Sequence, residues 1–265
     1  MRGPQMAGGG SMEGGGTMAG GGSMAGGGSM AGGGSMDFGE IQARLGDVRS
    51  VEIVPRYLLP ADWCIVEGVL GLADRALLAA YVAMQPRAAA EMTPAQSLLA
   101  LLATTENVSA VSARKRLCLA GELSPESEWA LSAVLLRSPL YRHCKSSLLW
   151  DHRRWLRVTY TLPASLDTEF RLVAAAAQHH PRNYYAWGYL RAFVATTCPD
   201  AAFLQAVRDL CARNLSDVSM WSFLHWLGDP ALEKFATETD ATFPGHPAVL
   251  AAQPPQPASQ TNYTK

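Results

Sequence analysis

Long apolar runs, paired cysteines and an excess of one charge are all missing from this sequence of 265 residues. Its five cysteines lie far apart and form no Cys-x-x-Cys pair, so we expect reduced thiols in a cytoplasmic protein, with neither a disulfide framework nor a zinc site. Lys and Arg (22) nearly balance Asp and Glu (23), which makes nucleic acid an unexpected partner. The longest apolar stretches, such as ALLAAYVAM, are too short to span a bilayer, so stable membrane insertion is not expected.

Both ends of the sequence are poor in the residues that build a core. Residues 6–35 are a hexapeptide tandem, MAGGGS with one MEGGGT, in which half of each unit is glycine. Such a segment buries too little apolar area to offset the backbone entropy lost on folding. We therefore expect residues 1–36 to be a disordered tail and the proline-rich residues 240–265 to be a second. Residues 37–239 would then form one domain.

Leucine, alanine and helix-capping residues dominate that domain. In SPESEWALSAVLLRSP, Ser124 can cap a helix, Pro125 suits its first position and Pro139 ends it. Only VRSVEIVP, residues 48–55, resembles a short extended segment. The pattern predicts an all-α fold.

A repeat organises these helices. Trp150, Trp187 and Trp221 follow one another at separations of 37 and 34 residues, and Val111 lies 39 residues before the first of them. A further helical segment precedes each of these positions, so the unit is helix, turn, helix, at the length expected of helical-hairpin arrays. The spacing predicts a solenoid, a right-handed crescent of hairpins in which the three tryptophans are structural anchors.

Two of these segments, PRNYYAW (residues 181–187) and WDHRRW (residues 150–155), resemble the protein prenyltransferase alpha-subunit repeat, in which P-x-N-Y-x-x-W precedes a His-Arg pair. RKRLCLAGEL, VEIVP and ADWCIVE are similar to one branch, the prenyltransferase alpha-subunit repeat-containing proteins. The resemblance extends over about residues 45–230 and is strongest between residues 110 and 190.

The resemblance implies an alpha-type subunit that has no activity and no cofactor of its own. It would wrap a zinc-containing beta subunit, here of the Rab geranylgeranyltransferase type, and line the site of the prenyl diphosphate that is transferred to a C-terminal cysteine of a protein substrate. Lys145, Arg182 and Tyr184 occupy the slots that face the diphosphate, where cations and hydroxyls stabilise the charge of the leaving group. The remaining motif residues are expected to contact the partner or to join adjacent hairpins: His152, Arg153, Arg154, Asn183 and Tyr185.

Other interpretations stay open. Ser147 replaces the first motif tyrosine, and Tyr189 and Leu190 replace the second His-Arg pair, which favours a catalytically inactive helical-repeat adaptor as the alternative function. Lys145 and Arg182 could equally be solvated residues at hairpin turns. The tandem histidines 179 and 180 lack a third ligand at useful spacing, so no metal site is expected. The sequence does not distinguish farnesyl from geranylgeranyl transfer.

Overall fold

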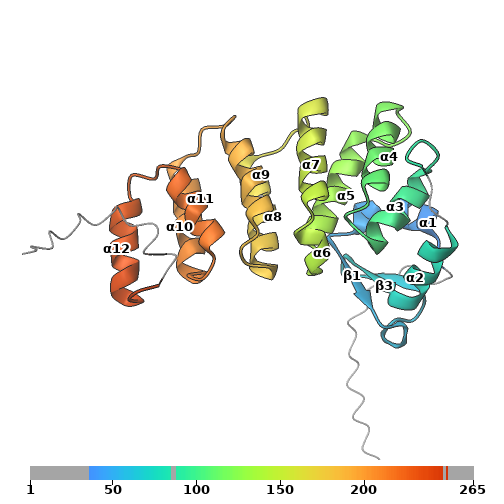
Figure 1. Ribbon diagram of the computed structural model, residues 1–265, viewed down its shortest axis with the longest axis horizontal. Coiled ribbons are helices and arrows are strands. Elements are labelled where there is room, and N and C mark those ends of the chain that lie inside the picture. The colour runs from blue at the N-terminus through green and yellow to red at the C-terminus, as the bar shows by residue number, and fades with distance from the viewer. Residues whose placement is uncertain (1–35, 85–87, 247–248, 250–265) are drawn as a thin grey trace, which may run out of the picture.

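The computed structural model of the protein describes residues 36–84, 88–246 and 249. The predicted N-terminal tail therefore lies outside the described residues except for Met36, and of the predicted C-terminal tail residues 240–246 and 249 are described. The described part is mostly helical, with twelve α-helices and one small sheet (Figure 1). None of the described helices is both long enough and apolar enough to cross a bilayer.

The prediction of an all-α fold is wrong for the N-terminal region. After α1 (Phe38–Ala43) and η1 (Leu45–Asp47), strands β1 (Ser50–Val54), β2 (Trp63–Val66) and β3 (Val69–Ala73) form a sheet with the order β1-β3-β2, and η2 (Arg56–Leu58) and α2 (Asp74–Ala83) complete the region. Strand β3 is parallel to β1 and antiparallel to β2. The overlooked signal is the dipeptide Glu67-Gly68, whose positive φ angles of 48° and 77° make the two-residue turn that joins β2 to β3.

Four helical hairpins follow the sheet and lie side by side in Figure 1, from the green to the red end of the chain. Their first and second helices are α3 (Pro94–Ala103) and α4 (Val108–Leu119), α5 (Pro125–Arg137) and α7 (Ser147–Tyr160), α8 (Leu166–His179) and α9 (Tyr184–Val194), and α10 (Ala201–Arg213) and α11 (Val218–Trp226). The short α6 (Tyr141–Cys144) lies between α5 and α7, and α12 (Leu232–Thr242) ends the row.

The second helix of every hairpin begins in the same way. Its N-cap is a short polar residue whose side chain accepts hydrogen bonds from backbone N–H groups of the first turn, and these residues are Asn107, Ser146, Asn183 and Asp217. The fourth helical residue is always the repeat position found in the sequence: Val111, Trp150, Trp187 and Trp221. A common start therefore sets a common register for the hairpins.

That register carries the core from one hairpin to the next. Trp150, Trp187 and Trp221 are all buried. The ring of Trp150 lies 5.3 Å, centroid to centroid, from that of Tyr189 in α9. The ring of Trp187 lies 5.0 Å from that of Phe223 in α11. Trp150 and Trp187 thus each contact an aromatic ring of the following hairpin, two residues beyond the next anchor, at distances typical of favourable aromatic pairs.

Candidate functional site

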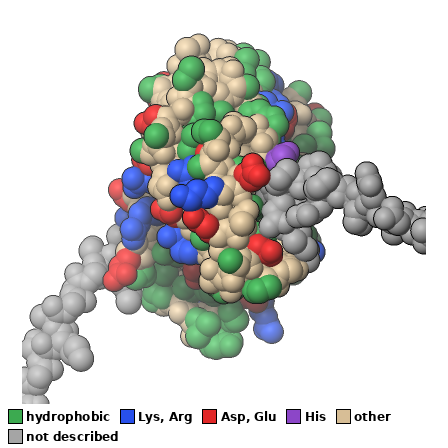
Figure 2. All heavy atoms as spheres, turned by 90° about the vertical axis from the view of Figure 1, so that its left-hand side faces the viewer, with side chains coloured by type: hydrophobic (Ala, Val, Ile, Leu, Met, Phe, Trp, Pro, Cys, Tyr) green, Lys and Arg blue, Asp and Glu red, His purple; other side chains and the backbone are tan. Residues whose placement is uncertain are grey.

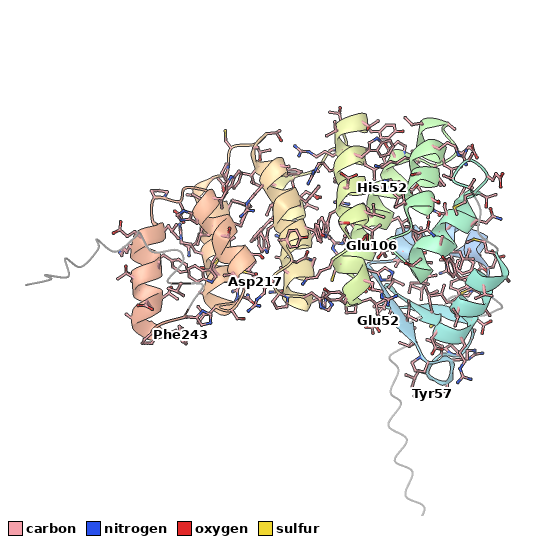
Figure 3. The ribbon with its side chains drawn as sticks, in the orientation of Figure 1. Glu52, Tyr57, Glu106, His152, Asp217 and Phe243 are labelled. Carbon is pink, nitrogen blue, oxygen red and sulfur yellow. The ribbon has the colours of Figure 1, made fainter. Side chains whose placement is uncertain are left out.

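A cleft of ≈500 Å³ opens between the turn that joins α3 to α4, the short helix α6 and the start of α9. We call it the lysine cleft, and its lining residues are Thr104, Glu106, Tyr141, Arg142, Lys145, Tyr184 and Tyr185. Glu106 lies below His152 in Figure 3, toward the ends at which the second helices begin. The cleft brings together Glu106, Lys145 and Tyr184, which lie about 40 positions apart in three successive repeats.

Lys145 is the half-buried cation of this cleft. It is the C-cap of α6, and its ammonium lies 5.2 Å from the centre of the Tyr141 ring, within the range of a cation–π interaction. The N-terminus of α7 begins two residues later, so its partial positive charge adds to that of the lysine. Glu106 opposes them, and its carboxylate accepts a 3.4 Å hydrogen bond from the hydroxyl of Ser147.

The two tyrosines form the other wall. Tyr184 is the first residue of α9, its side chain is exposed, and its ring lies 4.1 Å from that of Tyr185. Hydrogen bonding to Tyr185 raises the pKa of the Tyr184 hydroxyl above its ordinary value. The hydroxyl of Tyr184 therefore stays protonated at neutral pH and can donate to an anion.

Arg182 does not line the lysine cleft. It is exposed, and its φ angle of 61° places it in the left-handed region that turns the chain from α8 into α9. The cleft instead contains a second cation, Arg142, which the repeat motif does not include. With Lys145 and Arg142 against Glu106, the formal charge of the cleft is +1, because two cations face one carboxylate.

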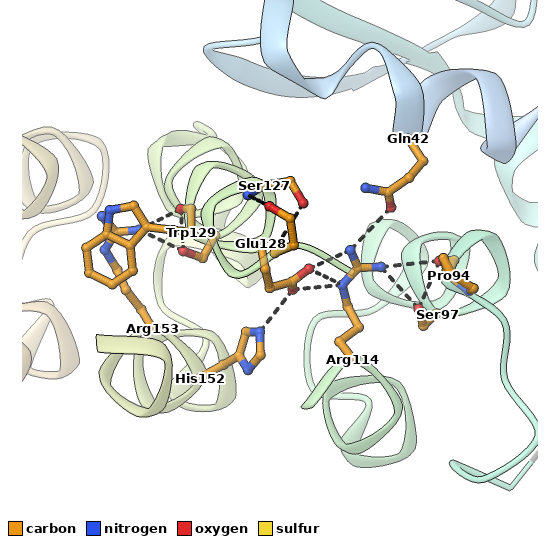
Figure 4. Close-up of polar contacts among 11 residues, drawn as sticks. Gln42, Pro94, Ser97, Arg114, Ser127, Glu128, Trp129, His152 and Arg153 are labelled. Atoms are coloured by element: carbon orange, nitrogen blue, oxygen red, sulfur yellow. Dashed lines mark hydrogen bonds and ion pairs between the residues drawn. The ribbon is translucent and has the colours of Figure 1, made fainter. Parts of the chain in front are cut away.

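His152 lies inside the protein, in a buried network centred on Glu128 (Figure 4). Arg114 donates to both oxygens of Glu128, with distances of 2.6 to 2.9 Å, and Nε2 of His152 lies 2.9 Å from Oε1. Burial by itself would raise the pKa of Glu128, but the charge of Arg114 and hydrogen bonds from His152 and Arg114 hold it at about 2. Glu128 is therefore a carboxylate at neutral pH.

The same arrangement recurs one repeat later. Arg153 donates to both oxygens of Glu169, at 2.9 and 2.7 Å, and the hydroxyl of Tyr189 donates to Glu169 at 2.7 Å. Arg153 also donates to the carbonyl of Trp129 and to the hydroxyl of Ser132. In the preceding repeat Arg114 makes the equivalent bonds, to the carbonyl of Pro94 and to the hydroxyl of Ser97. Each network joins the second helix of one hairpin to the first helix of the next.

Asn183 is also buried and joins hairpins at their edge. Its side-chain oxygen Oδ1 caps α9, and its side-chain NH₂ group donates at 2.8 Å to the backbone carbonyl of Cys144. The indole of Trp150 donates to that same carbonyl at 2.8 Å. Of the residues predicted to contact a partner or to join hairpins, Arg153 and Asn183 bond to another hairpin, whereas His152 bonds to Glu128 in the first helix of its own hairpin. The other two, Arg154 and Tyr185, are at least partly exposed.

Sequence reasoning missed Glu128 and Glu169, the acceptors of both networks. A signal for them exists, because each is the fourth residue of a first helix, in SPESEW and in SLDTEF. Within the described ranges, no three His, Cys, Asp or Glu side chains come close enough together to hold a metal ion.

The fold and these networks define a protein of repeated helical hairpins joined by buried ion pairs. Residues 149–243 match the model of the ECM9 middle domain. A zebrafish (Danio rerio) protein, the protein prenyltransferase alpha subunit repeat-containing protein 1, is 28% identical over 147 residues. That alignment covers 47% of this chain and 32% of the relative, so the chain spans about a third of the relative's length. This similarity confirms the predicted resemblance to the prenyltransferase alpha-subunit repeat proteins.

Proposed function

We propose that this chain is the alpha-type subunit of a heterodimeric protein prenyltransferase and acts in the cytoplasm. Its hairpins would form the right-handed crescent that holds a beta-type subunit, with the lysine cleft beside the prenyl diphosphate. The observation that carries the proposal is the meeting of Lys145, at the end of α6, and Tyr184, at the start of α9, in one cleft. The zebrafish relative, named as a protein that contains prenyltransferase alpha-subunit repeats, supports the family on which the proposal rests.

The chemistry of the cleft suits a diphosphate leaving group. When the cysteine sulfur of the protein substrate attacks the first carbon of the prenyl chain, the carbon–oxygen bond breaks and negative charge collects on the diphosphate. The ammonium of Lys145 and the hydroxyls of Tyr184 and Tyr185 can donate to that charge, and the N-termini of α7 and α9 add partial positive charge. The zinc and the isoprenoid barrel would belong to the beta subunit, so this chain alone is expected to be inactive.

The test is co-expression with a beta subunit of the Rab geranylgeranyltransferase type. Size exclusion should give a one-to-one complex, and the complex should transfer geranylgeranyl from its diphosphate to a protein with a C-terminal cysteine. Farnesyl diphosphate in the same assay distinguishes the two lipids. Lys145→Ala and Tyr184→Phe should each lower transfer by about tenfold or more, since each removes one donor to the developing charge. Lys234→Ala, at an exposed lysine of α12, is the matched control.

Two results would contradict the proposal. If no complex with the beta subunit forms, the proposal that this chain is a prenyltransferase subunit is wrong. A stable complex whose transfer is unchanged by Lys145→Ala and Tyr184→Phe would leave the lysine cleft without a catalytic role and would favour the helical-repeat adaptor.

A further inference from the structure

Basic residues occupy the same place in three consecutive hairpins, four residues after the anchor of the second helix: Lys115, Arg154 and Arg191. Two of them bridge to the next hairpin. The ammonium of Lys115 lies 3.4 Å from the carboxylate of Asp151. The guanidinium of Arg191 donates to the hydroxyl of Ser222 at 2.9 Å. Asp151 and Ser222 each directly follow an anchor, so the two bridges are equivalent.

The middle bridge is missing. The residue that follows the anchor Trp187 is Gly188, which has no side chain to meet Arg154. Arg154 is exposed and makes no hydrogen bond or ion pair with another described residue. A Cβ atom built on Gly188 would meet no other atom within 4 Å. At this junction the exposed Arg154 faces open space, whereas Lys115 and Arg191 each contact a polar side chain of the next hairpin at the neighbouring junctions.

This place borders a second cleft, of ≈490 Å³, between the C-terminal ends of α7 and α9. We call it the arginine groove, and it is lined by Arg154, Arg157, Val158, Thr161, Leu162, Pro163, Ala164, Tyr189, Ala192, Phe193, Thr196 and Thr197. The lining contains two cations and no carboxylate, and its walls are largely apolar. It lies at the opposite end of α7 from the lysine cleft, about 20 Å away for a helix of this length.

Arg157 is held in place along the groove wall. Its guanidinium lies 3.8 Å from the centre of the Phe193 ring, and it donates a hydrogen bond to the hydroxyl of Thr196. That hydroxyl in turn donates at 2.9 Å to the carbonyl of Phe193, near the end of α9. The threonine therefore satisfies a carbonyl at this helix end, where bare carbonyls would repel an anion.

We propose that the arginine groove binds an acidic, partly apolar segment of a partner polypeptide. A carboxylate of that segment pairs with Arg154 in the space above Gly188, as Asp151 pairs with Lys115 one hairpin earlier. Its apolar side chains lie against the groove walls around Phe193. A membrane surface fits less well, because the two arginines line a concave groove and the chain has a net charge of −1. Acidic and basic side chains are also mixed on the face seen in Figure 2.

The test uses the full chain and fluorescence anisotropy with an end-blocked, fluorescein-labelled octapeptide that alternates glutamate and leucine. The matched peptide has glutamine in place of glutamate. The acidic peptide should bind more tightly, and the difference should shrink as salt rises. Arg154→Gln should weaken its binding about fivefold, the effect of losing one largely exposed ion pair. Arg213→Gln, at an exposed arginine of α10, should leave binding unchanged.

Gly188 supplies the sharper comparison. Gly188→Asp introduces a carboxylate beside Arg154 and should weaken the acidic peptide about as much as Arg154→Gln. Gly188→Asn fills the same space without the charge, so it should weaken the acidic peptide clearly less than Gly188→Asp does. Because both substitutions place a side chain in open space within a helix, both variants should fold, which circular dichroism verifies.

Three results would overturn the proposal: equal binding of the acidic and glutamine peptides, full affinity in Gly188→Asp, or binding of phosphatidylserine vesicles in place of the acidic peptide. The test does not depend on prenyl transfer, so failure of the proposed function would leave it standing.

Discussion

At the scale of single residues, the molecule depends on carboxylates buried between hairpins. Glu169 and Arg153 are both almost fully buried, and each satisfies the charge of the other. In the following repeat the corresponding residues are Leu190, which is buried in the apolar core, and Leu204, which is partly buried and packs against that core. The same junction is therefore built once with an ion pair and once with leucines, as expected if a buried pair and an apolar pair have similar stability.

This leads to a prediction for Glu169. Glu169→Leu alone should lower the free energy of unfolding by about 3–5 kcal/mol, because Arg153 would then be a buried charge without its partner. Adding Arg153→Leu should recover part of that loss because it removes the unpaired charge, while the hydroxyl of Tyr189 stays without the acceptor that Phe223, its counterpart in the next repeat, does not need. Urea unfolding measures the free energy of unfolding of the single and the double variant. A double variant that is less stable than the single one would show that the ion pair itself, not the avoidance of an unpaired charge, holds the junction.

His143 in α6 makes the stability of the protein depend on pH. It is buried, and neither ring nitrogen has a hydrogen-bond partner among the described residues. Burial lowers its pKa from 6.5 to about 4. Between these values the unfolded chain binds the proton and the folded chain does not, so stability is complete above pH 6.5 and is lost as the pH falls toward 4.

In that pH range the loss should approach about 1.4 kcal/mol per pH unit. His143→Phe should remove this part of the pH dependence, as measured by urea unfolding at a series of pH values. Glu128 contributes in a separate range, since its stabilisation is lost below pH 4.5 as the pH approaches about 2. An unchanged slope between pH 6.5 and 4 in His143→Phe would assign the acid sensitivity to other groups.

At the scale of secondary-structure elements, the start of each second helix decides how the hairpins dock. Asn183 caps α9 and also reaches the carbonyl of Cys144 in the previous hairpin. Asp200 serves as a comparison, because it caps α10, the first helix of its hairpin. Its carboxylate accepts a hydrogen bond from the N–H of Phe203, and among the described residues it makes no hydrogen bond to another hairpin.

The two caps should therefore respond differently to alanine. Asp200→Ala should cost about 1 kcal/mol, the usual effect of losing a cap. Asn183→Ala should cost about 0.5–1.5 kcal/mol more, because it also loses the hydrogen bond to the Cys144 carbonyl, which the indole of Trp150 continues to satisfy. Thermal or urea unfolding of the two variants measures the difference. Equal losses would mean that Asn183 acts only on its own helix.

At the scale of the whole molecule, aromatic contacts link each hairpin to its neighbours. Trp187 lies in the second-last hairpin and contacts Phe223 of the last, while Trp221 contacts Phe235 of α12, 5.4 Å away. Arrays in which each unit contacts only its neighbours lose stability locally when one unit is damaged.

Trp187→Ala should thus lower hydrogen-exchange protection in α7, α9 and α11, and Trp221→Ala should affect mainly α10 to α12. Each substitution should cost about 3–5 kcal/mol, the usual effect of truncating a buried aromatic residue. Identical protection patterns in the two variants would show that the row of helices unfolds as a single cooperative unit.

The sequence by itself determined the helical hairpins, their register and the anchor tryptophans as repeat positions, because periodicity, caps and repeat spacing are local signals. Only the tertiary structure showed that His152 and Arg153 are buried against Glu128 and Glu169. It also placed Lys145 in one cleft with Tyr184 but left Arg182 outside it. The three-stranded sheet needed the same information, since its parallel pair joins strands 19 residues apart. Contacts between segments distant in sequence depend on how the hairpins pack, and no local pattern specifies that packing.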